Sequence, residues 1–145
     1  MAEVKILYWS GTGNTAAMAQ LVADGVTAGG ATPVIVPFEE TTPDSLASET
    51  AYALGCPSMG SEQLEESVVD PFVEELIASV SGKKILLFGS YGWGDGEWMR
   101  DWVEQMTGAG AEMIEAEGVI CNDAPDSDAE EALTAAGKAL AAAVN

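Results

Sequence analysis

Six consecutive residues near the start of the chain combine hydroxyl, amide and glycine groups without a charge. They read Ser-Gly-Thr-Gly-Asn-Thr over 10–15 and stand between an apolar run and a segment with helical spacing. The first N–H groups of a helix have no intrahelical partner and lie at the positive end of its dipole, so this position favours an anion. The side chains of Ser10, Thr12, Asn14 and Thr15 can donate further hydrogen bonds, each worth roughly 1.5–3 kcal/mol to a charged acceptor. The segment therefore predicts a phosphate site made of neutral donors.

Other phosphate loops fit this segment poorly. A nucleoside-triphosphate loop of the form GxxxxGK[ST] needs a lysine that is missing here, and a GxGxxG loop needs a third glycine where Ala16 stands. A phosphatase loop would place a cysteine and an arginine around the anion, and this segment has neither. A glycine-rich turn that binds nothing is the competing interpretation, although three hydroxyl residues are more than a turn requires.

A second segment, 90–96, offers an aromatic surface. It surrounds Trp93 with glycines at positions 92, 94 and 96, so the indole has few neighbours of its own to pack against. Stacking on a flat ligand is worth about 0.5–1.5 kcal/mol beyond burial. The competing interpretation is that Trp93 covers the core. Trp98 and Trp102, four residues apart on the following helix, are expected to pack in the core or on the helix surface.

A third segment, 57–62, offers the opposite wall for a flat ring. Met59 is an adaptable apolar side chain, and Gly60 can adopt backbone angles that other residues avoid. Glu62 can accept a hydrogen bond from a ring N–H, or it is simply a solvated acid. Together the second and third segments favour a flat, partly polar ligand.

The pattern of apolar residues predicts the elements that carry these segments. Asp70 followed by Pro71 indicates a helix start, and Ser127 with Glu130 has capping-box spacing. The strands are expected at 4–9, 32–36, 51–56, 84–88 and, with a break, 113–121; the helices are expected at 13–27, 43–49, 70–80, 97–106 and 127–144.

This alternation of strands and helices favours a parallel sheet covered on both faces through right-handed crossovers. Ligands of such sheets bind beyond the carboxyl ends of the strands, at the topological switch point. The segments 10–15, 57–62 and 90–96 each follow a predicted strand. We therefore expect the three segments to meet at one site.

Length and composition set the frame for this site. The 145 residues, 48% of them hydrophobic, suit a single domain over 1–145. No stretch approaches the roughly 20 apolar residues that span a bilayer, and no basic and apolar leader is present, so a soluble cytoplasmic protein is expected. Cys56 and Cys121 fit no disulfide framework and are expected to be buried thiols.

The charge is the most unusual global property. Five Lys and Arg residues stand against 24 Asp and Glu residues, which gives −19, and histidine is absent. Nucleic acid and anionic membrane are therefore disfavoured as partners, whereas basic partner proteins are favoured. Without histidine, Ser-His and Cys-His nucleophile pairs and histidine metal sites are excluded, and no metal is expected.

Three motifs in order resemble those of short-chain flavodoxins: SGTGNT after the first strand, MGSE after the third and GSYGWGDG after the fourth. The resemblance covers essentially the whole chain. It implies an α/β fold with a flavodoxin-like doubly wound five-stranded parallel sheet of order 2-1-3-4-5, helices on both faces, and noncovalently bound FMN. The cofactor-binding residues that it implies are Ser10, Gly11, Thr12, Gly13, Asn14, Thr15, Pro57, Ser58, Met59, Gly60, Ser61, Glu62, Ser90, Tyr91, Gly92, Trp93, Gly94 and Asp95.

The resemblance also assigns roles. Trp93 and Met59 would enclose the isoalloxazine ring, and Glu62 would meet its N3–H. Backbone groups around Tyr91 and Gly92 would meet the pyrimidine edge. The phosphate would be held by Ser10, Thr12, Asn14 and Thr15. Two positions depart from some relatives. Pro57 stands where certain members carry a hydroxyl residue, and Ser61 stands where others carry Asp, Asn or Gly.

The implied function is low-potential one-electron transfer, mainly between the semiquinone and hydroquinone forms of FMN, among basic-surfaced redox proteins. No catalytic residue is implied, and a monomer is expected. Gly60 and Ser61 would form the centre of a turn whose flipped form, with positive φ at glycine, suits the semiquinone. Carboxylates near the ring, each costing about 0.4 kcal/mol at roughly 10 Å in water, would make the hydroquinone a strong reductant.

The alternative is an FMN-dependent NAD(P)H:quinone oxidoreductase of the same fold. Such an enzyme needs a nicotinamide pocket, usually with cationic residues for its phosphates. The chain offers only Lys5, Lys83, Lys84, Arg100 and Lys138 for that purpose.

Overall fold

The structure is a computed structural model that describes residues 2–11, 13–59, 63–92 and 94–144. Its strands are β1 (Glu3–Tyr8), β2 (Thr32–Pro37), β3 (Ala51–Gly55), β4 (Lys84–Tyr91), β5 (Glu112–Met113) and β6 (Val119–Asn122). Its α-helices are α1 (Asn14–Ala28), α2 (Val69–Leu76), α3 (Glu97–Gly108) and α4 (Ser127–Val144), and its 3₁₀ helices are η1 (Phe38–Glu40), η2 (Pro43–Leu46) and η3 (Ile77–Ser79).

The strands form one parallel sheet in the order β2-β1-β3-β4-β5, which confirms the predicted topology. The fifth strand is interrupted, also as predicted, because β5 and β6 each pair with a different part of β4. A turn closed by the Gly118 N–H and the Glu115 carbonyl separates the two pieces. This arrangement extends β4 to Tyr91 and places its carboxyl end beside Asn122.

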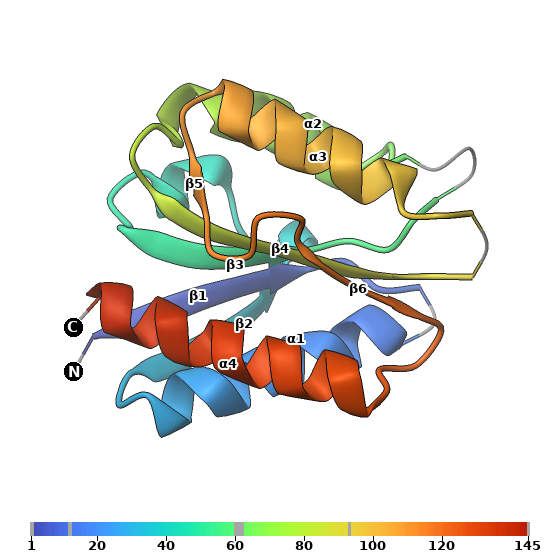
Figure 1. Ribbon diagram of the computed structural model, residues 1–145. Coiled ribbons are helices and arrows are strands. Elements are labelled where there is room, and N and C mark those ends of the chain that lie inside the picture. Colours follow the sequence, from blue (N-terminus) through green and yellow to red (C-terminus); the bar gives the residue numbers. More distant parts are fainter. Residues whose placement is uncertain (1, 12, 60–62, 93, 145) are drawn as a thin grey trace.

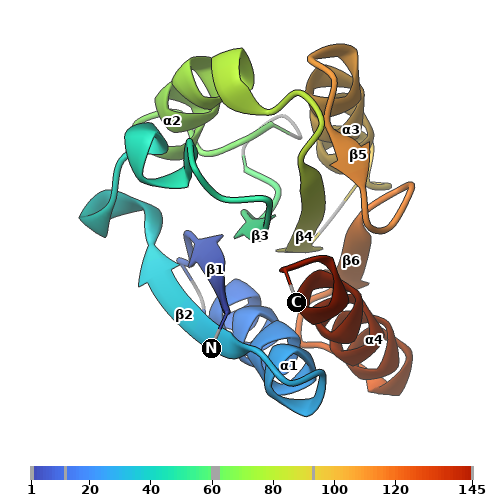
Figure 2. The same ribbon diagram turned by 90° about the vertical axis from the view of Figure 1, so that its left-hand side faces the viewer.

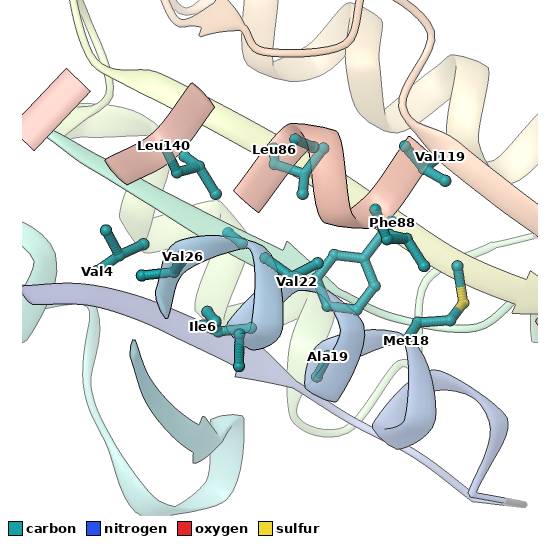
Figure 3. Close-up of a cluster of buried hydrophobic side chains, with 14 of the residues drawn as sticks. Val4, Ile6, Met18, Ala19, Val22, Val26, Leu86, Phe88, Val119 and Leu140 are labelled. Carbon is teal, nitrogen blue, oxygen red and sulfur yellow. The ribbon is translucent and has the colours of Figure 1, made fainter. Parts of the chain in front are cut away.

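Helices cover both faces of the sheet, as expected. α2 and α3 lie on one face and α1 and α4 on the other (Figures 1 and 2). Figure 3 shows the core between the sheet and the second pair, where Ile6 of β1 and Phe88 of β4 meet Val22 of α1. The core on the opposite face contains Trp98 and Trp102, each 1% exposed, so both indoles are core residues.

Two glycines allow α1 and α4 to pack closely. A Cβ atom on Gly25 of α1 would collide with the Thr134 carbonyl oxygen of α4, and one on Gly137 of α4 would collide with the Val22 carbonyl oxygen of α1. This contact fixes the axis of α1, and therefore the position of its N-terminus at the end of β1 (Figure 1).

Some predicted boundaries were wrong. The helix predicted at 70–80 begins at Val69, ends at Leu76 and continues as η3, and the short helix at 43–49 is the 3₁₀ helix η2. No helix in the described ranges combines the length and apolar character that a membrane crossing requires.

Candidate cofactor-binding site

A groove of about 380 Å³ lies beyond the carboxyl ends of β1, β3 and β4. This volume is within the usual range for small-molecule sites, about 300–1,000 Å³. The groove brings together parts of all three predicted segments, together with two residues outside them. It is lined by Trp9, Gly11, Asn14, Pro57, Ser58, Met59, Ser90, Tyr91, Gly92 and Asp123.

The first segment lies between β1 and α1, and its backbone N–H groups donate to a serine hydroxyl rather than to a carboxylate. Ser10 Oγ accepts hydrogen bonds from the Gly13 N–H at 3.0 Å and the Ala16 N–H at 3.4 Å. Gly13 has φ of 96°, a left-handed angle that favours glycine. Because Ser10 Oγ uses its lone pairs on these amides, its own hydrogen remains able to donate to an anion.

Thr15, in the first turn of α1, carries a hydroxyl without a partner. The residue is 1% exposed, and its Oγ1 has no hydrogen-bond partner in the described part of the chain. A buried unpaired hydroxyl costs about 1–3 kcal/mol. α1 also has no acidic residue in its first turn. The donors are therefore present where an anion would be held, and the first turn of α1 contains no carboxylate that competes for them.

The second segment is fixed by backbone pairing at both ends. The Ser58 N–H donates to the Ser90 carbonyl at 3.0 Å, which holds the segment beside β4. Met59 and Gln63 exchange two backbone hydrogen bonds, of 2.9 and 3.0 Å, and close the loop between them. The predicted residues Gly60, Ser61 and Glu62 lie outside the described residues.

The third segment contributes Ser90, Tyr91 and Gly92 to the groove. The Tyr91 ring packs on the buried Trp98 ring, with centroids 5.7 Å apart. The Trp98 indole N–H in turn donates to the Cys56 carbonyl at 3.0 Å. Core residues thus support the groove from behind.

Several predicted site residues are not among those lining the groove. Ser10, Gly13 and Thr15 belong to the anion loop described above. Gly94 and Asp95 follow the groove residues, and the Asp95 carboxylate pairs with Arg100 at 3.1 Å on the surface. Thr12 and Trp93 lie outside the described residues.

Two lining residues, Trp9 and Asp123, were absent from the sequence prediction. Trp9 is the last residue before the anion loop, a position that could have suggested it. Asp123 follows β6, and its φ of 57° is the only positive φ of a non-glycine residue in the described ranges. Its N–H donates to the Tyr91 carbonyl at 2.9 Å, and its carbonyl accepts from Ser90 Oγ at 2.6 Å. No local pattern in the sequence marks this contact.

Comparison with known proteins gives consistent matches. Residues 6–135 match the family model described as Flavodoxin. A flavodoxin from Clostridium beijerinckii is 46% identical over 138 residues, which cover 95% of this chain and 99% of that protein. The chain belongs to the flavodoxin family. A Megasphaera elsdenii flavodoxin is 50% identical over 127 residues, covering 88% of this chain and 91% of the relative. The solution structure of two-electron reduced Megasphaera elsdenii flavodoxin matches with a TM-score of 0.86 and 47% identity over 94% of this chain and 98% of that one.

Flavodoxins are electron-transfer proteins that bind FMN, so the chain is an FMN-binding electron carrier rather than an enzyme. The residues present fit this cofactor on two independent observations. The start of α1 offers neutral donors that suit a phosphate, including the Thr15 hydroxyl, which has no hydrogen-bond partner among the residues that the structure describes. The groove beside it has apolar walls, from Trp9 and Met59, that suit a flat ring. When bound, FMN supplies one-electron redox chemistry.

The loop that carries Met59 leads into a helix start with a different cap from the one predicted. Asp70 does not cap α2; instead the carboxylate of Glu65 accepts hydrogen bonds from the backbone N–H groups of Ser67, Val68 and Val69, at 2.8, 2.8 and 3.1 Å, and from the Ser67 hydroxyl. Glu65 is 7% exposed. Burial alone would raise the pKa of this carboxyl, but the four hydrogen bonds outweigh burial and lower its pKa.

The two cysteines are free and buried, as predicted. Burial raises the pKa of the Cys56 thiol to about 12 and also raises the pKa of Cys121. Thiolates, the reactive form, are therefore scarce at neutral pH. Throughout the described ranges, no three His, Cys, Asp or Glu residues are grouped so that they could hold a metal ion.

Proposed function

We propose that residues 10–15 hold the phosphate of FMN and that the groove between Trp9, Met59 and Tyr91 receives its ring, so that the chain passes single electrons between redox proteins. Residues 60–62 and Trp93, which the sequence assigns to the ring, complete this proposal. The protein supplies binding and electrostatics, and the redox chemistry is that of the cofactor.

The single observation that carries the assignment is the start of α1. A buried hydroxyl without a partner is unfavourable, and the Thr15 hydroxyl has none within the described ranges. In our proposal this hydroxyl donates its hydrogen bond to the phosphate. Ser10 keeps a donor for the same anion, because its oxygen is engaged by two amides. Several bonds of this kind hold a phosphate without a salt bridge.

We also propose that the partners present basic surfaces and that the protein works as a cytoplasmic monomer. The net charge of −19 supports basic partners, because complementary fields raise encounter rates. Three carboxylates, those of Glu66, Asp70 and Asp101, line a surface hollow of about 580 Å³ next to Gln63. This acidic area lies beside the loop that closes on Met59.

Three of the five cations that could serve a nicotinamide pocket make contacts elsewhere in the described structure. Lys5 Nζ donates to the Ser45 carbonyl, and Lys83 Nζ donates to the Leu46 and Ala47 carbonyls. Arg100 pairs with Asp95. These contacts support the carrier over the NAD(P)H-dependent enzyme.

The test is a titration of the purified, folded protein with FMN, followed by reduction. We expect one FMN to bind per chain with quenching of flavin fluorescence. We expect dithionite to bleach the bound flavin, whereas NADPH alone leaves it oxidised in a stopped-flow mix. A protein with native circular dichroism that takes up no FMN would refute the proposal, and rapid bleaching by NADPH would support the enzyme instead.

A further inference from the structure

Glu65 ties together three parts of the structure that lie around the ring side of the groove. Its carboxylate binds the first backbone amides before and within α2, through both oxygens. Its backbone carbonyl accepts from the Asp70 N–H at 2.9 Å. Its backbone N–H donates to Cys56 Sγ at 3.5 Å, at the end of β3. The residue therefore connects the beginning of segment 57–62 to the helix that follows it.

The connection reaches the groove through two residues. Gln63 is separated from Glu65 only by Leu64, and it is paired with Met59 through the two backbone bonds that close the loop. Met59 lines the groove. Met59, Gln63 and Glu65 also line one common hollow of about 320 Å³. Glu65 is therefore linked to Met59 by a short path, covalent from Glu65 to Gln63 and hydrogen-bonded from Gln63 to Met59.

We propose that Glu65 is a positioning residue for the flavin: its buried carboxylate anchors the paired residues Met59 and Gln63 on the N-terminus of α2 and so sets the position of the Met59 side chain. The proposal rests on the proposed function, in which Met59 contacts the ring. Glu65 itself touches neither ring nor phosphate, and it acts through Gln63 and Met59.

The geometry requires a carboxylate at this position. Four donors converge on two oxygens, and a carboxylate is acceptor-only. Glutamine has the same length but turns one acceptor into an NH₂ donor, which faces N–H groups. Asp70 provides the matched control. Asp70 is an exposed residue in the first turn of the same helix, so Asp70→Asn removes an equal charge without removing any hydrogen bond to the Glu65 carboxylate.

The experiment is residue-resolved hydrogen–deuterium exchange on the protein with and without added FMN. In Glu65→Gln we expect the amides of Met59 and Gln63 to exchange at least about tenfold faster, since one hydrogen bond to a charged group is worth a factor of this order. In Asp70→Asn both amides should keep the wild-type rate. The Leu54 amide in β3 serves as an internal reference and should not change in either variant. Equal acceleration in both variants, or acceleration that includes Leu54, would overturn the proposal.

A second readout follows the cofactor. The visible circular dichroism of bound FMN reports the surroundings of the ring, and we expect it to change in Glu65→Gln but not in Asp70→Asn. An unchanged signal in Glu65→Gln would overturn the link to the flavin. Exchange measured without FMN tests the anchor alone, so a failure of FMN to bind in the wild type would refute the proposed function and not the anchor.

If Glu65→Gln does not fold, Ser67→Ala replaces it. This variant removes one donor to the carboxylate and leaves the charge in place. The Met59 and Gln63 amides should then exchange faster than in the wild type, by less than in the glutamine variant. Wild-type rates at both amides in Ser67→Ala would overturn the proposal.

Discussion

The first backbone N–H groups of α1 and α2 have different hydrogen-bond acceptors. At α1, a neutral hydroxyl, Ser10 Oγ, accepts two amides, and the Thr15 hydroxyl has no partner in the described ranges. At α2, a buried carboxylate, that of Glu65, accepts four donors. In the described ranges, the chain supplies a carboxylate at the start of α2 and a neutral hydroxyl at the start of α1.

The other helices make the difference instructive. α2, α3 and α4 each carry an acidic residue in the first turn, and α1 carries none, in a chain with 24 acidic residues. An acid at this position stabilises a helix by about 0.3–1 kcal/mol. α1 lacks this gain. The proposed phosphate site gives an electrostatic reason, because a carboxylate in the first turn would repel a phosphate bound there.

The largest effect on FMN binding is expected when a carboxylate is introduced at the start of α1. In Asn14→Asp, the new charge stands beside the proposed phosphate, and repulsion of about 3 kcal/mol or more should weaken FMN binding by roughly a hundredfold or more. Riboflavin, which lacks the phosphate, should largely keep its affinity. Fluorescence titrations of both ligands measure the two effects.

Asn14→Ala is the control for this charge, because it removes the amide without adding repulsion. It should cost FMN about tenfold, the value of one hydrogen bond to a charged group. If Asn14→Asp weakened FMN and riboflavin equally, the start of α1 would not be the phosphate site.

Replacing Glu65 removes the carboxylate that caps the start of α2. Glu65→Gln should lower the free energy of unfolding of the protein without FMN by about 2 kcal/mol at pH 7, because hydrogen bonds to an ionised group are replaced by weaker ones. Urea unfolding measures the loss. Asp70→Asn, with the same change of charge at an exposed position, should lose much less.

The same pair of proteins should show a pH dependence of known sign. The folded pKa of Glu65 is lowered from its ordinary value of 4.5, so its stabilising contribution is fully present above that value. The contribution is lost as the pH falls through the lowered pKa. The difference between wild type and Glu65→Gln should therefore be constant from pH 7 to about pH 5 and shrink below it. A difference that grows in acid would contradict the hydrogen-bonded carboxylate.

At the start of α1, Thr15 and Ser10 should affect the stability of the protein and its affinity for FMN differently. Thr15→Val removes a hydroxyl that has no partner in the described structure, so the protein without FMN should be unchanged or stabilised by up to about 1 kcal/mol. FMN should bind about tenfold more weakly, because one donor to the phosphate is lost. Ser10→Ala should instead destabilise the protein by about 1 kcal/mol, since it removes a capping acceptor. Thermal unfolding and FMN titration of both variants test the contrast, and a destabilised Thr15→Val would show that its hydroxyl is already bonded.

The open end of α1 could be predicted from the sequence because its parts are contiguous. Strand, loop and helix follow within residues 4–27, and apolar periodicity with neutral donors is local information. The sheet order followed from the resemblance, and the alternating elements supported a parallel sheet. Met59 and Tyr91 could be placed near one edge of the sheet because segments 57–62 and 90–96 each follow a predicted strand.

The capping of α2 by Glu65 could not be predicted in the same way. Capping rules examine the residue just before the helix, and here that residue is Val68, whose side chain cannot accept a hydrogen bond. Glu65 reaches the helix from four residues before its first residue, across a turn that no periodic pattern reveals. Asp123 was missed for a related reason, because its backbone reaches Ser90 and Tyr91 only after β6 has paired with β4.

The smallest effects are expected from substitutions at the start of α4, which also has an acidic cap. The sequence pointed to Ser127 as the cap, but Asp126 fills that role: its carboxylate accepts from the Ala129 N–H at 2.9 Å, and its carbonyl accepts from the Glu130 N–H at 2.9 Å. Asp126→Ala should therefore cost about 1 kcal/mol of unfolding free energy, and Ser127→Ala only about 0.3 kcal/mol, by urea denaturation. Neither variant should alter FMN affinity, because α4, like α2, already holds its own anion. A larger cost for Ser127→Ala would support Ser127 as the cap. A loss of FMN affinity in Asp126→Ala would mean that an acidic residue at a helix start does not indicate which helix binds the phosphate.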